Sequence, residues 1–446
     1  MKMSKEQSIT DDPVTAFLEA CTWHGTLDPA EAILAVNPEM ATKSIHVAAT
    51  LGDDAGVDRM LALDAANASA VAPPYGANAL VYLCLSKYLR LDKTRSEAFL
   101  RAATSLLDAG ADPNSGFWTK GDHAELETAL YGAAGVAHHA ELTRLLLERG
   151  ANPNDEEAVY HSPETYDNAA MQLLVETGKL TDENLSLMLI RKHDWHDLDG
   201  AKYLLEHGTH PNRARQRGWR AMHHAIARDN RIEIIELLLD HGADPTLEDG
   251  GESPIVMAAR RGRGDLLQLF EKRGIPLELR GLDRLIAACA RNDLEAVQSI
   301  AADQPDLVRD LKQNAGKLLA EFAGNGNTDG MRHLLDLGLD VNAPFVEGDG
   351  YWDAAPNSTA LHVAAWRAQH DAVRLLIDRG AAVNQPDGKG RTALALAVRA
   401  CVDSYWTWRR SPESVEMLLE ARAATEGVKF PSGYAEVDEL LRRHSA

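Results

Sequence analysis

Short runs of apolar residues at helical spacing recur along the chain, and many of them end in the same way. A leucine pair is followed after a few residues by glycine, then by proline or valine, and then by asparagine or threonine. The leucines predict the buried side of a helix, and the glycine predicts the left-handed residue that ends it. The segments with this ending are 105–114, 144–154, 203–212, 236–246, 333–342 and 374–384, with glycines Gly110, Gly150, Gly208, Gly242, Gly338 and Gly380.

The beginnings of the helices also repeat. Thr128, Ser253, Thr359 and Thr392 each precede a short run that contains alanine. A hydroxyl at this position accepts a hydrogen bond from a free amide of the first helical turn. The small alanines let neighbouring helices approach closely. The pattern therefore predicts a series of short, closely packed helices.

These features form the motifs T-P-L-H-x-A and L-L-x-x-G-A-D-x-N, which recur at a spacing near ~33 residues. At these residues the chain resembles the ankyrin-repeat family. The resemblance implies an all-α solenoid of stacked helix-turn-helix units with hairpin fingers, about twelve units in number and several of them degenerate. It also implies that His362, at the place of the motif's histidine, forms structural hydrogen bonds between units.

The resemblance divides the chain as follows. Residues 1–12 are expected to be a disordered tail, and residues 13–426 the ankyrin-repeat solenoid. Repeats 13–72 lack the glycine ending and are expected to be degenerate N-terminal caps. Residues 427–446 are expected to contain a C-terminal capping helix, because terminal repeats need a polar outer face.

Composition narrows the classes of function. The 446 residues carry a net charge of −21, which argues against nucleic-acid binding. No two of the four cysteines are close in sequence, so no C-x-x-C site is predicted. Each lies in an apolar helical run, so we expect buried, reduced thiols and a cytoplasmic protein. The polar first residues predict no signal peptide, and no apolar run is long enough to span a membrane. We also expect a monomer.

Two predicted fingers are long and carry aromatic residues. Residues 114–126 include Trp118, and residues 342–357 include Tyr351 and Trp352. Two interpretations remain open: the aromatic side chains fold back and fill local gaps, or they are anchors for a partner.

Arginine recurs just after the alanine pair of the first helix in most repeats of the C-terminal half, with Gly324 and Asn325 as an exception. In the family these positions face the concave groove, so the pattern predicts a basic strip that binds an acidic protein surface. The alternative is that each arginine is paired with a nearby carboxylate. We call these residues the arginine strip: Arg228, Arg260, Arg261, Arg291, Arg367 and Arg399, with Trp366 beside them. Residues 213–220 add further arginines.

Sequence motifs that would indicate catalysis, metal binding or phosphate binding are weak in this chain. His193 to Asp197 contain two histidines and two aspartates, but their spacing fits no metal-binding motif, and no nucleophile elbow or phosphate loop occurs. We therefore expect no catalytic residue, metal or cofactor. The leading hypothesis is a protein-binding scaffold, in one version an inhibitor or immunity-type protein. The alternative is an enzyme or small-molecule binder whose pocket is closed by finger 342–357, and a third hypothesis is binding of an anionic polymer along the arginines.

Overall fold

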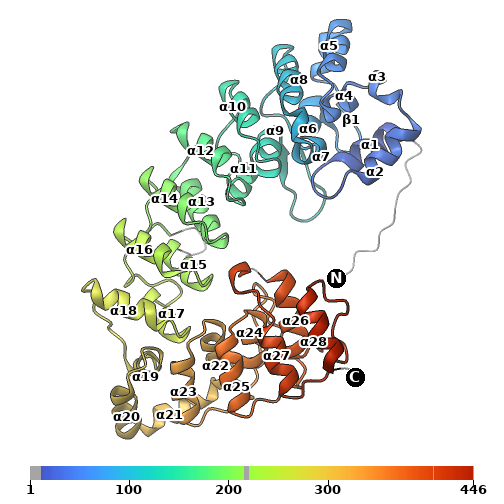
Figure 1. Cartoon of the computed structure of the whole chain (residues 1–446). Coiled ribbons are helices and arrows are strands. Elements are labelled where there is room, and N and C mark those ends of the chain that lie inside the picture. Colours follow the sequence, from blue (N-terminus) through green and yellow to red (C-terminus); the bar gives the residue numbers. More distant parts are fainter. Residues whose placement is uncertain (1–11, 215–219, 405, 445–446) are drawn as a thin grey trace. The chain divides into compact units, whose positions relative to one another are not determined.

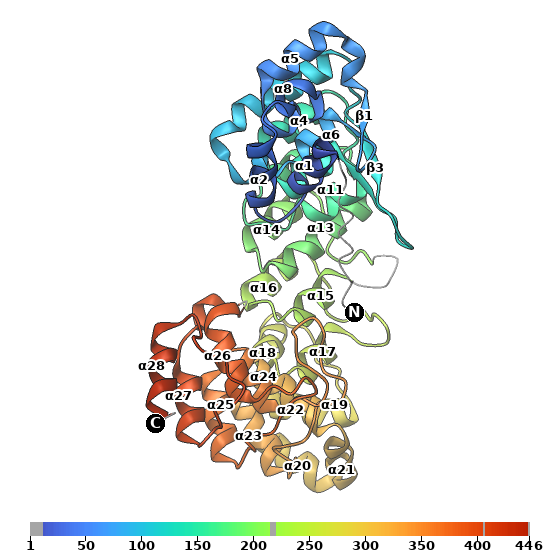
Figure 2. The same cartoon turned by 90° about the vertical axis from the view of Figure 1, so that its right-hand side faces the viewer.

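A computed structural model describes residues 12–214, 220–404 and 406–444 (Figures 1 and 2). The chain forms two compact units, which we call unit 1 (Met1–Ala243) and unit 2 (Asp244–Ala446). Residues 1–11 of the predicted tail lie outside the described residues. The described part begins at Asp12, whose carboxylate accepts hydrogen bonds from Val14 N and Thr15 N at the start of the first helix.

Unit 1 contains short helices and two small hairpins. Its helices are α1 (Pro13–Cys21), α2 (Asp28–Val36), α3 (Met40–Lys43), α4 (Ile45–Leu51), α5 (Asp54–Leu63), α6 (Ala79–Cys84), α7 (Lys87–Leu91), α8 (Ser96–Asp108), α9 (Ala129–Tyr131), α10 (Ala140–Glu148), α11 (Glu156–His161), α12 (Ala169–Glu176), α13 (Asp182–Asp194), α14 (Leu198–Glu206), α15 (Ala221–Ala227) and α16 (Ile232–Asp240). A π-helical turn, η3 (Gly132–Val136), continues α9, and 3-10 turns lie at η1 (Ala65–Ala68) and η2 (Lys93–Arg95).

The hairpins of unit 1 are antiparallel pairs. Strand β1 (Val71–Ala72) pairs with β2 (Ala77–Asn78), and β3 (Gly116–Trp118) pairs with β4 (Leu126–Thr128). In the second hairpin Phe117 lies opposite Glu127, and Trp118 lies opposite Leu126. Figure 2 shows this hairpin extending to one side of the helices of unit 1.

Unit 2 continues the same architecture. Its helices are α17 (Pro254–Arg260), α18 (Gly264–Lys272), α19 (Gly281–Ala290), α20 (Leu294–Asp303), α21 (Pro305–Gln313), α22 (Ala315–Gly324), α23 (Thr328–Asp336), α24 (Ala360–Trp366), α25 (His370–Asp378), α26 (Ala393–Asp403), α27 (Glu413–Glu420) and α28 (Ala435–His444), with a 3-10 turn at η4 (Thr407–Arg409). Helix α21 lies between α20 and α22 as an additional helix outside the repeat pattern.

Within the described ranges the helices form twelve consecutive pairs, which agrees with the predicted number of about twelve repeats. The pairs are α1/α2, α4/α5, α6/α8, α9/α10, α11/α12, α13/α14, α15/α16, α17/α18, α19/α20, α22/α23, α24/α25 and α26/α27. First helices pack on first helices, as α4 does on α6 and α22 on α24, and second helices pack on second helices, as α5 does on α8. The core lies between these two layers.

The predicted helix ends are confirmed. The six glycines named above have φ between 83° and 97°, the left-handed region that ends a helix. At the starts, Thr128 Oγ1 accepts from Tyr131 N at 3.0 Å, and Thr392 Oγ1 accepts from Ala395 N at 3.3 Å. His362 Nδ1 lies 3.1 Å from Thr359 N, and its Nε2 lies 3.1 Å from Arg391 O of the next repeat. The structural role implied for His362 is therefore confirmed.

The asparagine that closes the repeat motif connects neighbouring repeats. Asn342 Oδ1 accepts from Ala382 N at 2.7 Å, and its Nδ2 donates to Gly380 O at 3.5 Å. In the following repeat, Asn384 Oδ1 accepts from Ala424 N at 2.7 Å and its Nδ2 donates to Arg422 O at 3.3 Å. Each of these asparagines thus satisfies polar backbone groups where the second helix of the next repeat ends, at Gly380 and at Arg422, whose φ angles of 86° and 65° are both left-handed. We call this arrangement the asparagine ladder; in unit 1 it includes Asn114, Asn154 and Asn212.

Candidate functional site

Arg228, the member of the arginine strip that belongs to unit 1, is bound to a carboxylate. It follows α15 directly, and its Nε donates to Asp194 Oδ1 at 2.7 Å. His224 Nε2 lies 2.8 Å from the same oxygen. Burial alone would raise the pKa of Asp194, but the hydrogen bonds from His224 and Arg228 lower it. Arg228 therefore connects the ends of α13 and α15.

Helix α17 of unit 2 ends at two further arginines of the strip, and both have acidic partners. Arg260 Nε and Nη2 donate to the two oxygens of Asp283 at 2.7 and 3.1 Å, and its Nη1 donates to Glu252 at 3.1 Å. Arg261 Nη1 donates to Glu321 Oε1 at 3.1 Å. These pairs connect α17 to α19 and to α22.

The same residues border a cavity of about 380 Å³ in unit 2. This volume lies near the lower end of the ~300–1,000 Å³ that is usual for ligand pockets. Its apolar lining comes from α17, α19, α21 and α22: Met257, Leu282, Ile286, Leu311 and Leu318. Its polar lining contains equal numbers of acidic and basic side chains with one amide: Glu252, Asp283, Glu321, Arg260, Arg261, Lys317 and Asn314.

Glu321 is the buried acid of this cavity. Its side chain and backbone together are 8% exposed, and burial raises the pKa of its carboxyl against the opposing effect of Arg261. Because Arg261 holds one of its oxygens, Glu321 is fixed in orientation. The cavity therefore combines an apolar lining, a fixed buried acid and a charged rim that includes the exposed Lys317.

Arg291 also has a carboxylate within reach. It follows α19 directly, and its Nη1 lies 3.2 Å from Glu271 Oε1 of α18. The alternative interpretation of the strip, in which each arginine has a nearby acid, thus describes these four arginines in the structure. Their contact with a partner is untested and stays a prediction.

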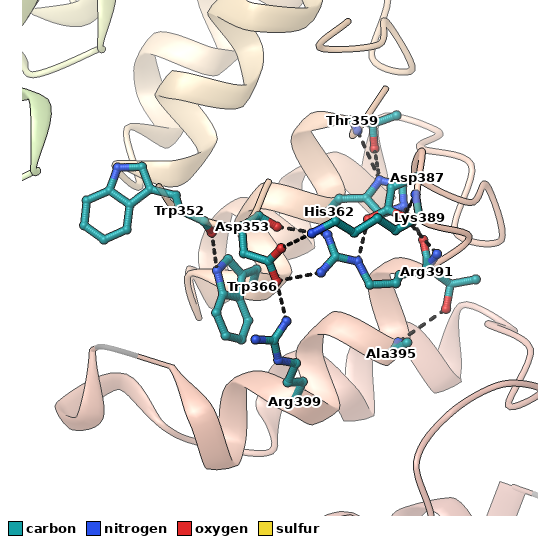
Figure 3. Close-up of polar contacts among 11 residues, drawn as sticks. Trp352, Asp353, Thr359, His362, Trp366, Asp387, Lys389, Arg391, Ala395 and Arg399 are labelled. Atoms are coloured by element: carbon teal, nitrogen blue, oxygen red, sulfur yellow. Dashed lines mark hydrogen bonds and ion pairs between the residues drawn. The ribbon is translucent and has the colours of Figure 1, made fainter. Parts of the chain in front are cut away.

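Finger 342–357 is held against the next repeat through Asp353 (Figure 3). Arg391 Nη1 donates to Asp353 Oδ2 at 2.7 Å, Arg399 Nη1 donates to the same oxygen, and Lys389 Nζ donates to Oδ1. Burial alone would raise the pKa of Asp353, but hydrogen bonds from these three cations hold it well below its usual range. Arg391 is oriented in turn by Asp387, which accepts from its Nε at 2.8 Å.

The aromatic residues next to Asp353 are buried. Trp352 and Trp366 are 4% and 3% exposed, and Trp366 Nε1 donates to Trp352 O at 2.7 Å (Figure 3). The guanidinium carbon of Arg367 lies 4.8 Å from the centre of the Trp352 ring and 5.0 Å from that of Trp406. Burial, with a smaller contribution from Arg409, lowers the pKa of Arg367 to about 9. Trp352, Trp366 and Arg367 thus fill the base of the finger in this structure. Their contact with a partner stays a prediction.

Two of the predicted anchors are exposed. Tyr351 at the tip of finger 342–357 is 40% exposed, and Trp118 in β3 is 65% exposed. The side chain of Arg399 is partly exposed. Its guanidinium carbon lies 4.4 Å from the centre of the Trp366 ring, and the group also binds Asp353. Of the arginines expected in 213–220, those within 215–219 lie outside the described residues.

Sequence reasoning missed the acid at the centre of the cavity. The pattern search compared the positions after the alanine pair of each first helix, which are Arg260 and Arg261 in α17 and Gly324 and Asn325 in α22. Residues three or four positions earlier lie on the same helix face, and in these helices they are Met257 and Glu321. A comparison that included this spacing would have found two residues that line the cavity.

Within the described ranges, no group of three or more histidine, cysteine, aspartate or glutamate side chains is arranged to hold a metal ion. All four cysteines are buried and unpaired. Helices long and apolar enough to cross a membrane were not found in the part of the chain that the structure describes.

Comparison with known proteins gives one family. A family model described as "Ankyrin repeats (3 copies)" matches residues 156–249, 187–279, 285–387 and 319–426. The chain is also 39% identical over 71 residues to potassium channel AKT1 of Oryza sativa subsp. indica, a match that covers 16% of this chain and 8% of the channel. It is 39% identical over 77 residues to human 2-5A-dependent ribonuclease, covering 17% and 10% of the two chains. Human BCL-6 corepressor-like protein 1 is 49% identical over 66 residues, covering 15% and 4%. The match thus spans a tenth or less of each of these relatives.

Proposed function

Since the chain belongs to the ankyrin-repeat family, whose repeats generally mediate protein–protein interaction, we propose that it is a scaffold whose unit 2 binds a protein partner at the cavity between α17, α19, α21 and α22. One apolar side chain of the partner enters the cavity, and Arg260 and Lys317 on its rim contact carboxylates beside that side chain. The observation that carries the proposal is the apolar lining of the cavity behind a charged rim.

The energetic argument follows from the lining. An apolar side chain that leaves water for this cavity gains ~25 cal/mol for each Å² it buries, and such anchors dominate binding energy when they fill a pocket. The rim adds selectivity more than affinity, because Arg260 is already paired with Asp283 and Glu252 and must exchange partners on binding. The expected preference for an acidic partner thus depends on Lys317 and on the release of Arg260 from Asp283.

The finer predictions belong to this proposal and are untested. They are an inhibitor or immunity-type role, a monomeric chain, a cytoplasmic location, and partner contacts by Tyr351, Trp118, Arg228, Arg291 and Arg399. The competing proposal, a small-molecule or enzymatic site under finger 342–357, has to explain why the cavity described here is lined by no residue of that finger.

The test uses one substitution at two places in the same repeat. Leu282→Trp fills the cavity from its half-buried edge, whereas Leu294→Trp adds the same side chain at a position that is 54% exposed outside it. Both variants and the parent are used to capture proteins from a native lysate. A stoichiometric protein that is retained by the parent and by Leu294→Trp, but is lost from Leu282→Trp, supports the proposal. Retention of every captured protein by Leu282→Trp refutes binding at the cavity.

The charge of the rim is tested by Lys317→Glu. Substituting Arg261 would place a second carboxylate against Glu321, and misfolding would then be hard to separate from lost binding. Lys317 is exposed, and its charge acts on the pKa of Glu321 more weakly than that of Arg261 does, so its reversal leaves the Arg261–Glu321 ion pair in place. Weaker capture of the same protein by Lys317→Glu indicates an acidic partner surface, and stronger capture indicates a basic one.

A further inference from the structure

One carboxylate oxygen in the cavity of unit 2 is not used by the Arg261–Glu321 ion pair. Arg261 Nη1 donates to Glu321 Oε1 at 3.1 Å. The second oxygen, Oε2, accepts no hydrogen bond from the residues that the structure describes, and it is not sealed from solvent. Because Glu321 is buried and lines the cavity, the space open to this oxygen is the cavity itself. A buried carboxylate oxygen without a donor is costly, so an occupant that supplies a donor is favoured.

The position of Glu321 in α22 sets how far a side chain has to reach. Lys317 lies four residues earlier, about 6 Å along the helix axis, and is exposed at the rim. Leu318, the next residue, is already buried. Helix α22 therefore leads from the rim at Lys317 to the buried acid at Glu321. A short side chain such as valine stays near the rim, and a long one is needed to meet Oε2.

The walls of the cavity between the rim and Glu321 are apolar. Ile286, Leu311 and Leu318 form the buried part of the lining, and Met257 and Leu282 form its half-buried part. None of these side chains can donate a hydrogen bond. The donor for Glu321 Oε2 thus has to come from the occupant of the cavity, and the rest of that occupant has to be apolar.

The charges around the cavity favour a neutral donor over a cation. Acidic and basic side chains are equal in number in the lining, and the acids already have basic partners. Arg260 binds Asp283 and Glu252, and Arg261 binds Glu321. The ammonium group of a lysine would lose its hydration here, and it would approach the guanidinium of Arg261 in order to reach Oε2. A neutral N–H group avoids both costs.

We propose that the side chain that enters the cavity is a tryptophan of the partner, whose rings pack on the apolar lining and whose indole N–H donates to Glu321 Oε2. An indole has one donor and no acceptor, so it brings no further polar atom into the apolar part of the cavity. Tryptophan is also enriched among the side chains that anchor protein interfaces. This inference rests on the function proposed above and makes it more specific, since the partner presents tryptophan beside acidic residues that meet Lys317.

The test changes the occupant, because a substitution of Glu321 would leave Arg261 without its acid. Two fluorescein-labelled peptides carry a central residue between pairs of glutamates. That residue is tryptophan in one peptide and benzothienylalanine in the other, which keeps the ring shape but has sulfur in place of the N–H group. Fluorescence anisotropy measures the binding of each peptide to the whole chain in about 0.15 M salt. We expect the tryptophan peptide to bind at least about tenfold more tightly, which corresponds to ~1.4 kcal/mol.

The variants Leu282→Trp and Leu294→Trp separate this inference from the proposed function. Binding of the tryptophan peptide should be lost in Leu282→Trp and kept in Leu294→Trp. If the two peptides bind the parent equally and both are lost in Leu282→Trp, the indole N–H has no role, but the cavity remains the binding site. If both bind Leu282→Trp as well as the parent, binding at the cavity is refuted as well.

Two further outcomes would overturn the inference alone. One is a tryptophan peptide that does not bind the parent, in which case capture from lysate still decides the proposed function. The other is a third peptide, with lysine as its central residue, that binds the parent more tightly than the tryptophan peptide does. Glu321 would then take a cation from the partner.

Discussion

Replacing Gly262 by alanine should destabilise unit 2 more than the same replacement at Gly274, although both glycines end helices of the same pair. Their φ angles are 70° and 74°, so an alanine at either position adopts the left-handed conformation at a cost of about 1–2 kcal/mol. A lower entropy of the unfolded chain offsets ~0.4–1 kcal/mol of this cost. Backbone conformation alone therefore predicts a similar loss of about 1 kcal/mol at both sites.

The difference comes from the space around the added methyl group. A Cβ at Gly274 meets no heavy atom within 4 Å, whereas a Cβ at Gly262 would lie 2.7 Å from two carbons of the Phe322 ring. Phe322 is fully buried in α22, so its ring can move only if its neighbours repack. Overpacking of this kind typically costs about 1–3 kcal/mol. We therefore expect Gly262→Ala to lower the free energy of unfolding by about 2–4 kcal/mol.

Urea denaturation followed by circular dichroism measures both variants. The midpoint of Gly262→Ala should lie clearly below that of Gly274→Ala at equal slope. In a Phe322→Leu background the extra cost of Gly262→Ala should shrink, which a double-mutant cycle detects. Equal midpoints for the two glycine variants, or a larger loss at Gly274, would refute the packing that places Gly262 against Phe322.

Three further predictions concern titratable side chains. Asp353→Asn removes the charge that binds Arg391, Arg399 and one lysine, so we expect a loss of about 1–3 kcal/mol in urea denaturation at neutral pH. Because the pKa of Asp353 is lowered by folding, its contribution is present above the unfolded pKa of ~3.9 and disappears as the pH falls; the difference between parent and variant should therefore narrow in acid. Glu127→Gln should show the opposite dependence of stability on pH. Burial raises the pKa of Glu127 to about 7, so the parent loses stability as the pH rises from ~4.3 to about 7. The variant should therefore melt at a higher temperature than the parent at pH ~8 but not at pH ~4. His362→Ala should cost about 1–2 kcal/mol through the lost helix cap and the lost bond to Arg391 O, and an unchanged melting temperature would contradict its role between units.

Local features of the fold could be predicted from the sequence, because they depend on residues close together in the chain. The glycine endings, the hydroxyl caps and His362 each act within one helical turn or on the next repeat. The asparagine ladder could have been inferred in the same way, since its bonds recur at the repeat spacing. Its role was missed because an asparagine after a helix also fits an ordinary turn.

The candidate site depended on contacts that a repeat alignment does not contain. Arg260 meets Asp283 in the next repeat, and a search one repeat ahead would have found this pair. Arg261 instead meets Glu321, which is 60 positions further along the chain. Trp352 was one of the finger aromatics with two open interpretations, and it packs against the Trp406 ring of the following repeat. Trp366, placed beside the arginine strip, is buried and lies against Arg399 of the following repeat.

The asparagine ladder has a consequence for how such a chain can change in length. Asn342 and Asn384 bind equivalent backbone atoms in whichever repeat follows each of them. A duplication or deletion that spans the distance from one asparagine to the next would recreate the same junction without any compensating substitution. We therefore expect that gene rearrangements that add or remove whole repeats in this part of unit 2 are tolerated more readily than a shift of a few residues, which would leave an asparagine and a helix end without their partners.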